Sequence, residues 1–167
     1  VIYLLGACVT FAMLRERVDA IISIPNDKLL SIIDRKTSVI SAFKIVDDIL
    51  RQGVQGISDL ITKPGLVNVD FADVRAIMQD SGAALMGIGI ASGENRAVEA
   101  AKAAINSPLL ELSIDGARGV LFNVAASSDL GMMEINEAAS IITENVDPNA
   151  KIIFGTTVDD QIRKGEV

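Results

Sequence analysis

One long amphipathic segment constrains this chain more than any other feature of its sequence. Apolar residues recur at steps of three and four from Ser38 onward, until the sequence Lys63-Pro64-Gly65 ends the pattern. The spacing predicts a single helix over 38–62, about 37 Å long at about 1.5 Å per residue. A helix of that length crosses a whole domain, so the remaining elements must pack along it.

Short runs of branched residues alternate with further helical patterns in the rest of the chain. Strands of four to eight such residues, separated by helices of ten or more, indicate an α/β sheet with helical crossovers. We expect strands at 19–27, 83–90, 119–126 and 151–158, and helices at about 70–80, 94–105 and 133–145.

Charge and composition exclude several classes of function. The formal net charge is −7, the pI is about 4.5, and Lys and Arg form no run longer than two, which argues against a nucleic-acid partner. The chain contains no histidine, which removes Ser-His-Asp triads, Cys-His pairs and His-ligated metals. Carboxylates, amides, hydroxyls and backbone groups remain to carry any chemistry.

The first 13 residues differ from the rest of the chain. Residues 1–13 are mostly apolar, but they are shorter than the roughly 18 to 20 residues that span a bilayer, and no basic residue precedes them. We therefore expect no direct membrane insertion. Cys8 is the only cysteine, so no intramolecular disulfide can form, and we expect a cytoplasmic location.

Two glycines lie inside the predicted long helix. In a helix interior Gly53 and Gly56 each cost up to about 1 kcal/mol relative to alanine, so close backbone approach is expected there. Tight helix packing is the favoured explanation, and a ligand contact is the alternative.

The stretch MGIGIASGENRA (86–97) resembles a dinucleotide-binding turn only superficially. After Gly87 and Gly89 the motif requires glycine at position 92, which is serine. We expect Ser92 or Gly93 to cap the following helix instead. The chain also lacks a G-x-x-x-x-G-K-S/T sequence, so it has no phosphate loop of that type.

The loop after the long helix contains the candidate catalytic residues Asn68, Asp70 and Asp73. Asp70 is well placed to be the N-cap of the next helix, with Asp73 at its third position near the positive end of the helix dipole. The same spacing projects two carboxylates and an amide from one loop, where they can orient a water or hold a cation. From the residues alone, capping is the favoured interpretation.

A resemblance to a known family bears on the role of these three residues. The stretch GVQGISDLITKPGLVNVDFADVR (53–75) resembles the synergy loop of FtsZ, the bacterial tubulin-like GTPase that polymerises into the cell-division ring. The resemblance covers 14–166, because four further segments match that family in order and spacing: LRERVDAIISIPNDKLL, SGAALMGIGIASGENRAVEAAKAAINSPLLE, GARGVLFNVAASSDLGMMEINEAASII and NAKIIFGTTVDD.

The resemblance implies an α/β fold in which a long central helix is followed by a mixed β-sheet domain packed with helices. It assigns 14–37 to a remnant of the GTP-binding domain, 38–63 to the central helix and 64–167 to the C-terminal GTPase-activating domain. Residues 1–13 are foreign to the family pattern, and the last sheet strand of the family would follow residue 167. We therefore expect a unit that is incomplete at both ends.

The resemblance also implies roles for individual residues. In FtsZ this loop enters the nucleotide pocket of the next subunit, so Asn68, Asp70 and Asp73 would help to position and activate the water that attacks the γ-phosphate of GTP. On the long helix, Phe43 matches a position that stacks on guanine, although a core role for it stays open. Asp47 matches a position that accepts hydrogen bonds from the base.

The expected function is therefore that of a fragment of FtsZ, which polymerises head to tail in the cytoplasm at the division site. Other FtsZ subunits are its expected partners, with division adaptor proteins as further candidates. The glycine-rich tubulin signature is absent, so GTP, with Mg²⁺ as a candidate companion, would be bound mainly by the N-terminal domain. The fragment alone is expected to be inactive. The alternative is a stand-alone α/β binding or filament-capping module without a catalytic role.

Overall fold

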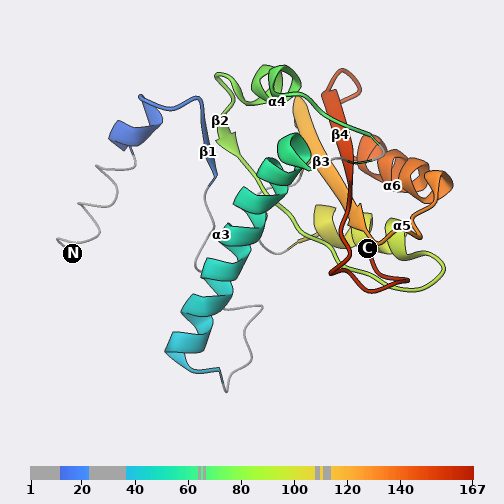
Figure 1. Cartoon of the computed structure of the whole chain (residues 1–167). Helices are drawn as coiled ribbons and strands as arrows, with labels where there is room; N and C mark the ends of the chain where they lie inside the picture. The colour runs from blue at the N-terminus through green and yellow to red at the C-terminus, as the bar shows by residue number, and fades with distance from the viewer. Residues whose placement is uncertain (1–11, 23–36, 64, 66, 108–109, 111–113) are drawn as a thin grey trace.

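A computed structural model describes residues 12–22, 37–63, 65, 67–107, 110 and 114–167 (Figure 1). The order of helices and strands confirms the predicted α/β class. In chain order the elements are β1 (Ala20–Ile22), α3 (Val39–Thr62), α4 (Phe71–Met78), β2 (Gly82–Ala84), α5 (Arg96–Ile105), β3 (Gly119–Ala126), α6 (Met132–Glu144) and β4 (Lys151–Val158).

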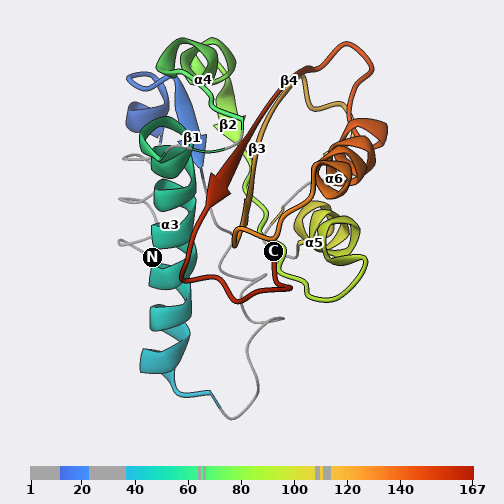
Figure 2. The same cartoon turned by 45° about the vertical axis from the view of Figure 1, so that its right-hand side comes forward.

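The strands β3 and β4 form the centre of the molecule. They pair in parallel, in a register that runs from Gly119 opposite Lys151 to Ala126 opposite Val158. Figure 2 shows α3 and α4 on one side of these strands and α5 with α6 on the other. β1 and β2 form a second, short parallel pair. The described strands thus form two two-stranded parallel sheets, of which β3–β4 lies between α3 with α4 and α5 with α6.

The two faces of β3 and β4 bury different apolar clusters. Because side chains alternate along a strand, Val120 and Phe122 face α5 and α6, whereas Leu121 faces α3 and α4. Phe122 stacks on Phe154 of β4 with ring centroids 5.5 Å apart. The buried members of the first cluster are Ala97, Ala101, Ala138 and Ile142, and those of the second are Leu60, Val69 and Val74.

The long helix begins and ends where the sequence predicts. The Ser38 hydroxyl accepts a hydrogen bond from the Ser41 backbone N–H at 3.2 Å, which satisfies one free donor of the first turn. At the other end the Lys63 N–H donates to the Asp59 carbonyl, and Pro64 prevents continuation. The described part of the chain contains no helix long and apolar enough to cross a membrane.

The prediction of a strand over 83–90 is wrong beyond Ala84. The segment after Ala84 runs against α5 instead, where a Cβ on Gly87 would overlap the Ala104 carbonyl and a Cβ on Gly89 would overlap the Ala100 carbonyl. The glycines of this stretch therefore permit close approach of backbone to a helix of small residues.

The predicted cap of α5 is also wrong, because the N-cap is Asn95 rather than Ser92 or Gly93. Residues 91–93 instead pair antiparallel with residues 165–167, as in the hydrogen bond from the Gly93 N–H to the Gly165 carbonyl at 3.1 Å. That pairing fixes the segment in a conformation that does not cap the helix.

The two glycines of α3 differ from each other. Gly53 is buried, and a Cβ there would overlap the sulfur of Met86, so the prediction of tight packing is confirmed for Gly53. An added Cβ at Gly56 would meet no atom of the described residues within 4 Å. Packing within the described residues therefore does not explain Gly56.

Candidate functional site

The loop between α3 and α4 and the first turn of α4 present the three predicted catalytic residues on the surface. Asn68, Asp70 and Asp73 are exposed, whereas Val69 is only 6% exposed and Val74 only 4%. Two buried valines thus lie among exposed residues in the loop and the first turn of α4. The buried members hold the segment on the core while the polar members face outward.

Asp70 is the N-cap of α4, as predicted. Its Oδ1 accepts a hydrogen bond from the Asp73 backbone N–H at 2.8 Å, and the Asp70 carbonyl accepts one from the Val74 N–H at 3.3 Å. Both carboxylates therefore lie in the first turn, beside the positive end of the helix dipole. Capping occupies one oxygen of Asp70 and leaves the other oxygen outside the cap.

Asn68 is exposed, but one of its polar atoms is used within the loop. Its Oδ1 accepts a hydrogen bond from the Gly65 N–H at 2.8 Å, which closes a turn within the loop. The carbonyl side of the amide is thus used internally. The NH₂ group is the part of Asn68 that is directed away from this bond and can donate to a ligand.

The loop is joined to β4 through Thr156, a residue that sequence reasoning did not single out. The Val67 N–H donates to the Thr156 hydroxyl at 2.8 Å, and the Thr156 N–H donates to the Val67 carbonyl at 3.0 Å. A Cβ on Gly65 would overlap the Thr156 carbonyl oxygen. Glycine at position 65 therefore lets the loop run directly against the strand.

Apolar contacts lie beneath the same loop. Val69 packs with Leu60 and Val74, and Gly155 of β4 provides the room, since a Cβ on Gly155 would overlap Leu60 and lie 3.2 Å from Val69. A glycine in a strand interior often marks such close packing. The loop is therefore fixed by both directional and apolar contacts.

Lys63 joins the end of α3 to the end of β4. Its ammonium lies 2.9 Å from an Asp59 carboxylate oxygen and 3.2 Å from one of Asp159. Hydrogen bonds to Asp59 and Asp159 raise the pKa of Lys63. The pKa of Asp159 is lowered, first by the Gln161 backbone N–H and then by Lys63. The two elements that flank the loop are thus held together at its base.

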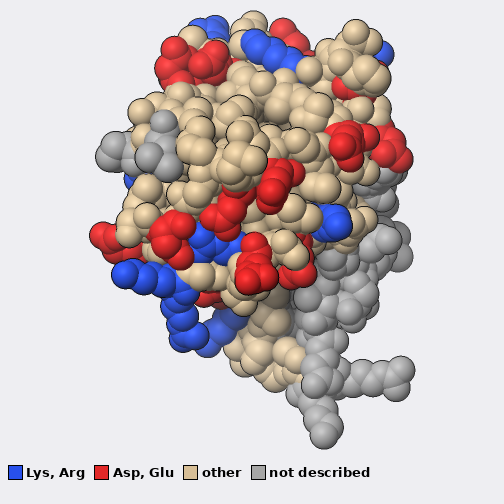
Figure 3. Space-filling view, turned by 90° about the vertical axis from the view of Figure 1, so that its right-hand side faces the viewer, with Lys and Arg blue, Asp and Glu red and all other residues tan. Residues whose placement is uncertain are grey.

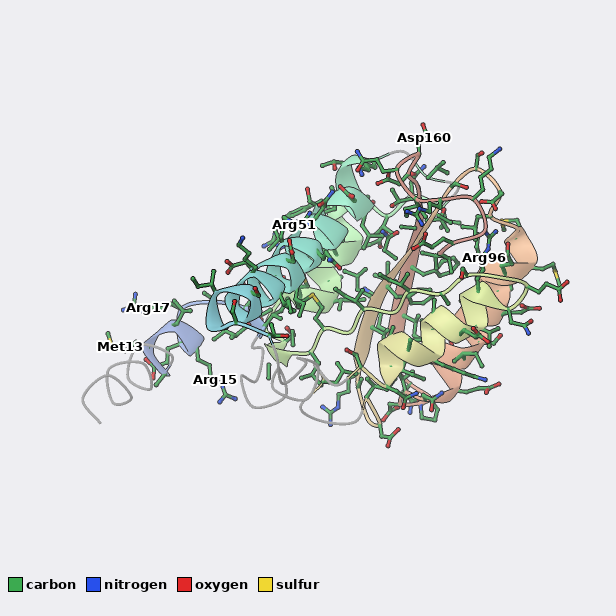
Figure 4. All side chains as sticks on the ribbon, turned by 90° about the horizontal axis from the view of Figure 1, so that it is seen from below. Met13, Arg15, Arg17, Arg51, Arg96 and Asp160 are labelled. Atoms are coloured by element: carbon green, nitrogen blue, oxygen red, sulfur yellow. The ribbon has the colours of Figure 1, made fainter. Side chains whose placement is uncertain are left out.

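A second polar cluster, centred on Arg96, was also missed by sequence reasoning. Arg96 is 5% exposed, and its guanidinium donates to Glu134 at 2.7 and 3.0 Å and to the Asp129 carboxylate at 2.8 Å. Asp129 also accepts from the Ser127 hydroxyl and the Gly165 N–H. Figure 4 shows Arg96 beside α5 and α6, on the opposite side of the strands from Arg51 of α3.

We call Arg96, Ser127, Asp129 and Glu134 the Arg96 cluster. Its hydrogen bonds hold its carboxylates in the charged form. Donation from Ser127, then Arg96, keeps the pKa of Asp129 well below its usual range. Arg96 likewise lowers the pKa of Glu134. The spacing Gly131-x-x-Glu134 is a sequence signal for part of it, because Glu134 accepts from the Gly131 N–H at 2.8 Å, as a capping glutamate does.

The two residues predicted to contact guanine lie far from the loop between α3 and α4. Asp47 is exposed on α3, and the axis from residue 47 to the end of the helix at residue 62 is about 22 Å long at about 1.5 Å per residue. Phe43 is in the same helix, but its side chain lies outside the described residues. Asp47 and the loop carboxylates are therefore not brought together into one site of this chain.

No metal site is evident in the described residues, and the face in Figure 3 carries charges of both signs. They contain no group of three or more His, Cys, Asp or Glu side chains arranged to hold a metal ion. On the face in Figure 3, Lys and Arg side chains lie next to Asp and Glu side chains rather than forming a broad basic surface.

The long helix, the anchored loop and the helix-covered strands define a unit of the tubulin-like class. The family model described as "FtsZ family, C-terminal domain" matches residues 82–166, and the chain belongs to the FtsZ family. Two similar solved structures are an empty FtsZ dimer and a single-residue FtsZ mutant, both from M. jannaschii. Each is 43% identical to this chain and has a TM-score of 0.86. Each match covers 92% of this chain, which spans 44% of the length of the first structure and 46% of the second.

Proposed function

We propose that this chain contributes the activating half of an FtsZ active site: Asn68, Asp70 and Asp73 enter the GTP pocket of a neighbouring subunit in a head-to-tail filament. One observation carries the proposal, namely that the three side chains are exposed on the loop before α4 and in its first turn, and that the loop backbone is fixed to β4. Groups that act on a bound partner must be both accessible and held in place. The similarity to an FtsZ dimer supports other FtsZ subunits as the partner.

In the proposed reaction, water attacks the γ-phosphorus of GTP and the bond to the β–γ bridging oxygen breaks, giving GDP and phosphate. The Asp70 and Asp73 carboxylates accept hydrogen bonds from the water and orient it in line with the leaving group. The Asn68 NH₂ donates to the water or to a phosphate oxygen. Positioning and charge placement supply most of the catalysis in phosphoryl transfer, which suits a rigid loop.

The described residues fit only part of the requirements for GTP binding. Asp47 is an exposed carboxylate that can accept hydrogen bonds from the edge of guanine, and Phe43 is proposed to stack on the base. The phosphates, with Mg²⁺, would be held by an N-terminal nucleotide-binding domain. Since the charged phosphates provide most of the affinity for a nucleotide, we propose that this chain alone neither binds GTP tightly nor hydrolyses it.

The separation of Asp47 from the loop supports the head-to-tail arrangement. If Asp47 faces the nucleotide of its own subunit, carboxylates at the far end of α3 are free to face the nucleotide of another. A heterologous interface of this kind produces an open filament. We place this assembly in the cytoplasm at the division site, with adaptor proteins as further partners and with neither a nucleic-acid partner nor direct membrane insertion.

The test uses an intact, GTP-loaded FtsZ whose own two loop carboxylates have been replaced by amides, so that its pockets lack activation. Adding the present chain should restore phosphate release. Asp70→Asn and Asp73→Asn should each abolish the gain, while Asp70→Asn keeps an N-cap acceptor and so preserves the fold of the loop. The matched control is Glu137→Gln, which removes an exposed carboxylate from α6 and should restore turnover like the wild type.

The same experiment separates the alternative function. If the wild-type chain and both Asp variants bind the intact FtsZ equally and none of them raises phosphate release, the chain is a binding or filament-capping module rather than a catalytic half. Filament length measured by electron microscopy then shows whether binding shortens the filaments.

A further inference from the structure

The loop that carries the carboxylates is joined to the sheet by one residue that makes two hydrogen bonds to it. Thr156 is 3% exposed, its hydroxyl accepts from the Val67 N–H at 2.8 Å, and its N–H donates to the Val67 carbonyl at 3.0 Å. A single loop residue is thus held through both of its backbone polar groups. One of these two bonds depends on the side chain of Thr156 and can be removed by substitution.

The other contacts of the loop do not fix it in the same way. The Asp70 cap and the Asn68 turn are local, because each joins residues three apart in the sequence. The contacts of Val69 with Leu60 and Val74 are apolar and therefore non-directional. Lys63 joins the end of α3 to Asp159, which lies outside the loop. Among the described contacts, the Thr156–Val67 pair is the directional one that sets the place of the loop along β4.

We propose that Thr156 is a positioning residue for hydrolysis, in that its hydroxyl sets where the Asp70 and Asp73 carboxylates lie relative to the rest of the molecule. This inference rests on the proposed function. Val67 lies three residues before Asp70 in the chain, so a shift of the loop backbone at Val67 is transmitted to the cap and the first turn of α4. A misplacement of about 1 Å at a reacting group can reduce turnover on the order of 100-fold.

The neighbouring residue provides a matched control. Thr157 is 2% exposed, but its hydroxyl donates to Asn123 Oδ1 at 3.1 Å, within the β3–β4 pair. Thr157→Val therefore removes a buried hydroxyl from the same strand without removing a contact to the loop. If Thr156 had only a structural role, Thr156→Val would lower phosphate release no more than Thr157→Val does.

The first measurement is amide hydrogen exchange of the whole chain. Thr156→Val removes the acceptor of the Val67 N–H, so exchange at Val67 should become about tenfold faster under native conditions. Thr156→Ser keeps the hydroxyl and should restore slow exchange. Thr157→Val should leave Val67 close to wild type. Equal acceleration in both valine variants, or none in Thr156→Val, would overturn the anchoring role.

The second measurement is phosphate release by the intact FtsZ whose two loop carboxylates have been replaced by amides, titrated with each variant. Thr156→Val should lower the turnover at saturation on the order of 10- to 100-fold and leave the half-saturating concentration of chain unchanged, since docking contacts remain. Thr156→Ser and Thr157→Val should retain most of the wild-type turnover. Full turnover with Thr156→Val, or an equal loss with Thr157→Val, would overturn the proposal.

The two measurements also separate the failure of this inference from failure of the proposed function. If the wild-type chain does not raise phosphate release at all, the proposed function is wrong, and with it the catalytic meaning of Thr156. If the wild-type chain is active but Thr156→Val is equally active despite faster exchange at Val67, only the positioning role is wrong.

Discussion

The carboxylate loop is joined to β4, and α5 is joined to α6 in the Arg96 cluster, but the two regions are held by different chemistry. The loop is held by neutral groups, namely the Thr156–Val67 hydrogen bonds and the packing of Val69. The Arg96 cluster is held by a guanidinium that is bonded to two carboxylates. In the described residues no Lys or Arg pairs with Asp70 or Asp73.

This difference separates carboxylates that stabilise the fold from carboxylates that are available to a partner. Asp129 and Glu134 are both paired with Arg96 and cannot act elsewhere without disrupting the cluster. Asp70 and Asp73 are exposed, and within the part of the chain that the structure describes they form no ion pair. An exposed, unpaired carboxylate on a fixed backbone is suited to orienting a water molecule.

The largest effect is expected from removing the guanidinium of the Arg96 cluster. Arg96→Met keeps an apolar stem but leaves Asp129 and Glu134 without their cation, so the free energy of unfolding should fall by about 3–5 kcal/mol. Urea denaturation measures the loss. The control Arg51→Met removes an exposed ion pair to Asp48 and should cost less than about 0.5 kcal/mol. Equal losses in the two variants would contradict the role of Arg96.

A smaller effect is expected from changing pH. The pKa of Asp129 is lower in the folded chain than in the unfolded chain, so as pH falls the unfolded chain takes up the proton first. The stabilisation is present above about pH 5 and is lost progressively below about pH 4. The melting temperature of Asp129→Asn should therefore lie below that of wild type at neutral pH, and the difference should narrow in acid.

The reference for this measurement is Glu137→Gln, which accounts for the loss of one exposed negative charge from α6. A difference between wild type and Asp129→Asn that stays constant from about pH 7 to about pH 3 would contradict the linkage.

The smallest effect is expected in the carboxylate loop, at the N-cap of α4. Asp70→Ala removes the acceptor for the Asp73 N–H and should cost about 1 kcal/mol of unfolding free energy, whereas Asp70→Asn should cost only a few tenths, about 0.3 kcal/mol. Thermal unfolding distinguishes them. If Asp70→Asn destabilises the chain as much as Asp70→Ala, the carboxylate charge rather than the cap is the stabilising feature.

The sequence predicted elements well where local signals decide their ends. β3 and β4 have the predicted bounds of 119–126 and 151–158, because branched residues in each are bounded by turn residues. The Pro64 stop of α3 and the Asp70 cap of α4 are equally local. The position of the candidate catalytic residues just after the long helix could therefore be predicted.

Features that depend on distant residues could not be predicted in this way. Arg96 bonds to residues 33 and 38 positions away, and Val67 bonds to Thr156 89 positions away. β2 stops after Ala84 because the glycines beyond it pack on α5 rather than on a strand. No short-range pattern specifies these partners, so the anchoring of the loop became visible only in the structure.

The most direct test of the shared active site is hydrogen exchange of this chain in complex with intact FtsZ loaded with a non-hydrolysable GTP analogue. We expect protection of the backbone over residues 67–74 on binding and unchanged exchange over α6. Protection of α6 without protection of the loop would contradict the proposed arrangement, because the exposed carboxylates would then lie away from the neighbouring nucleotide.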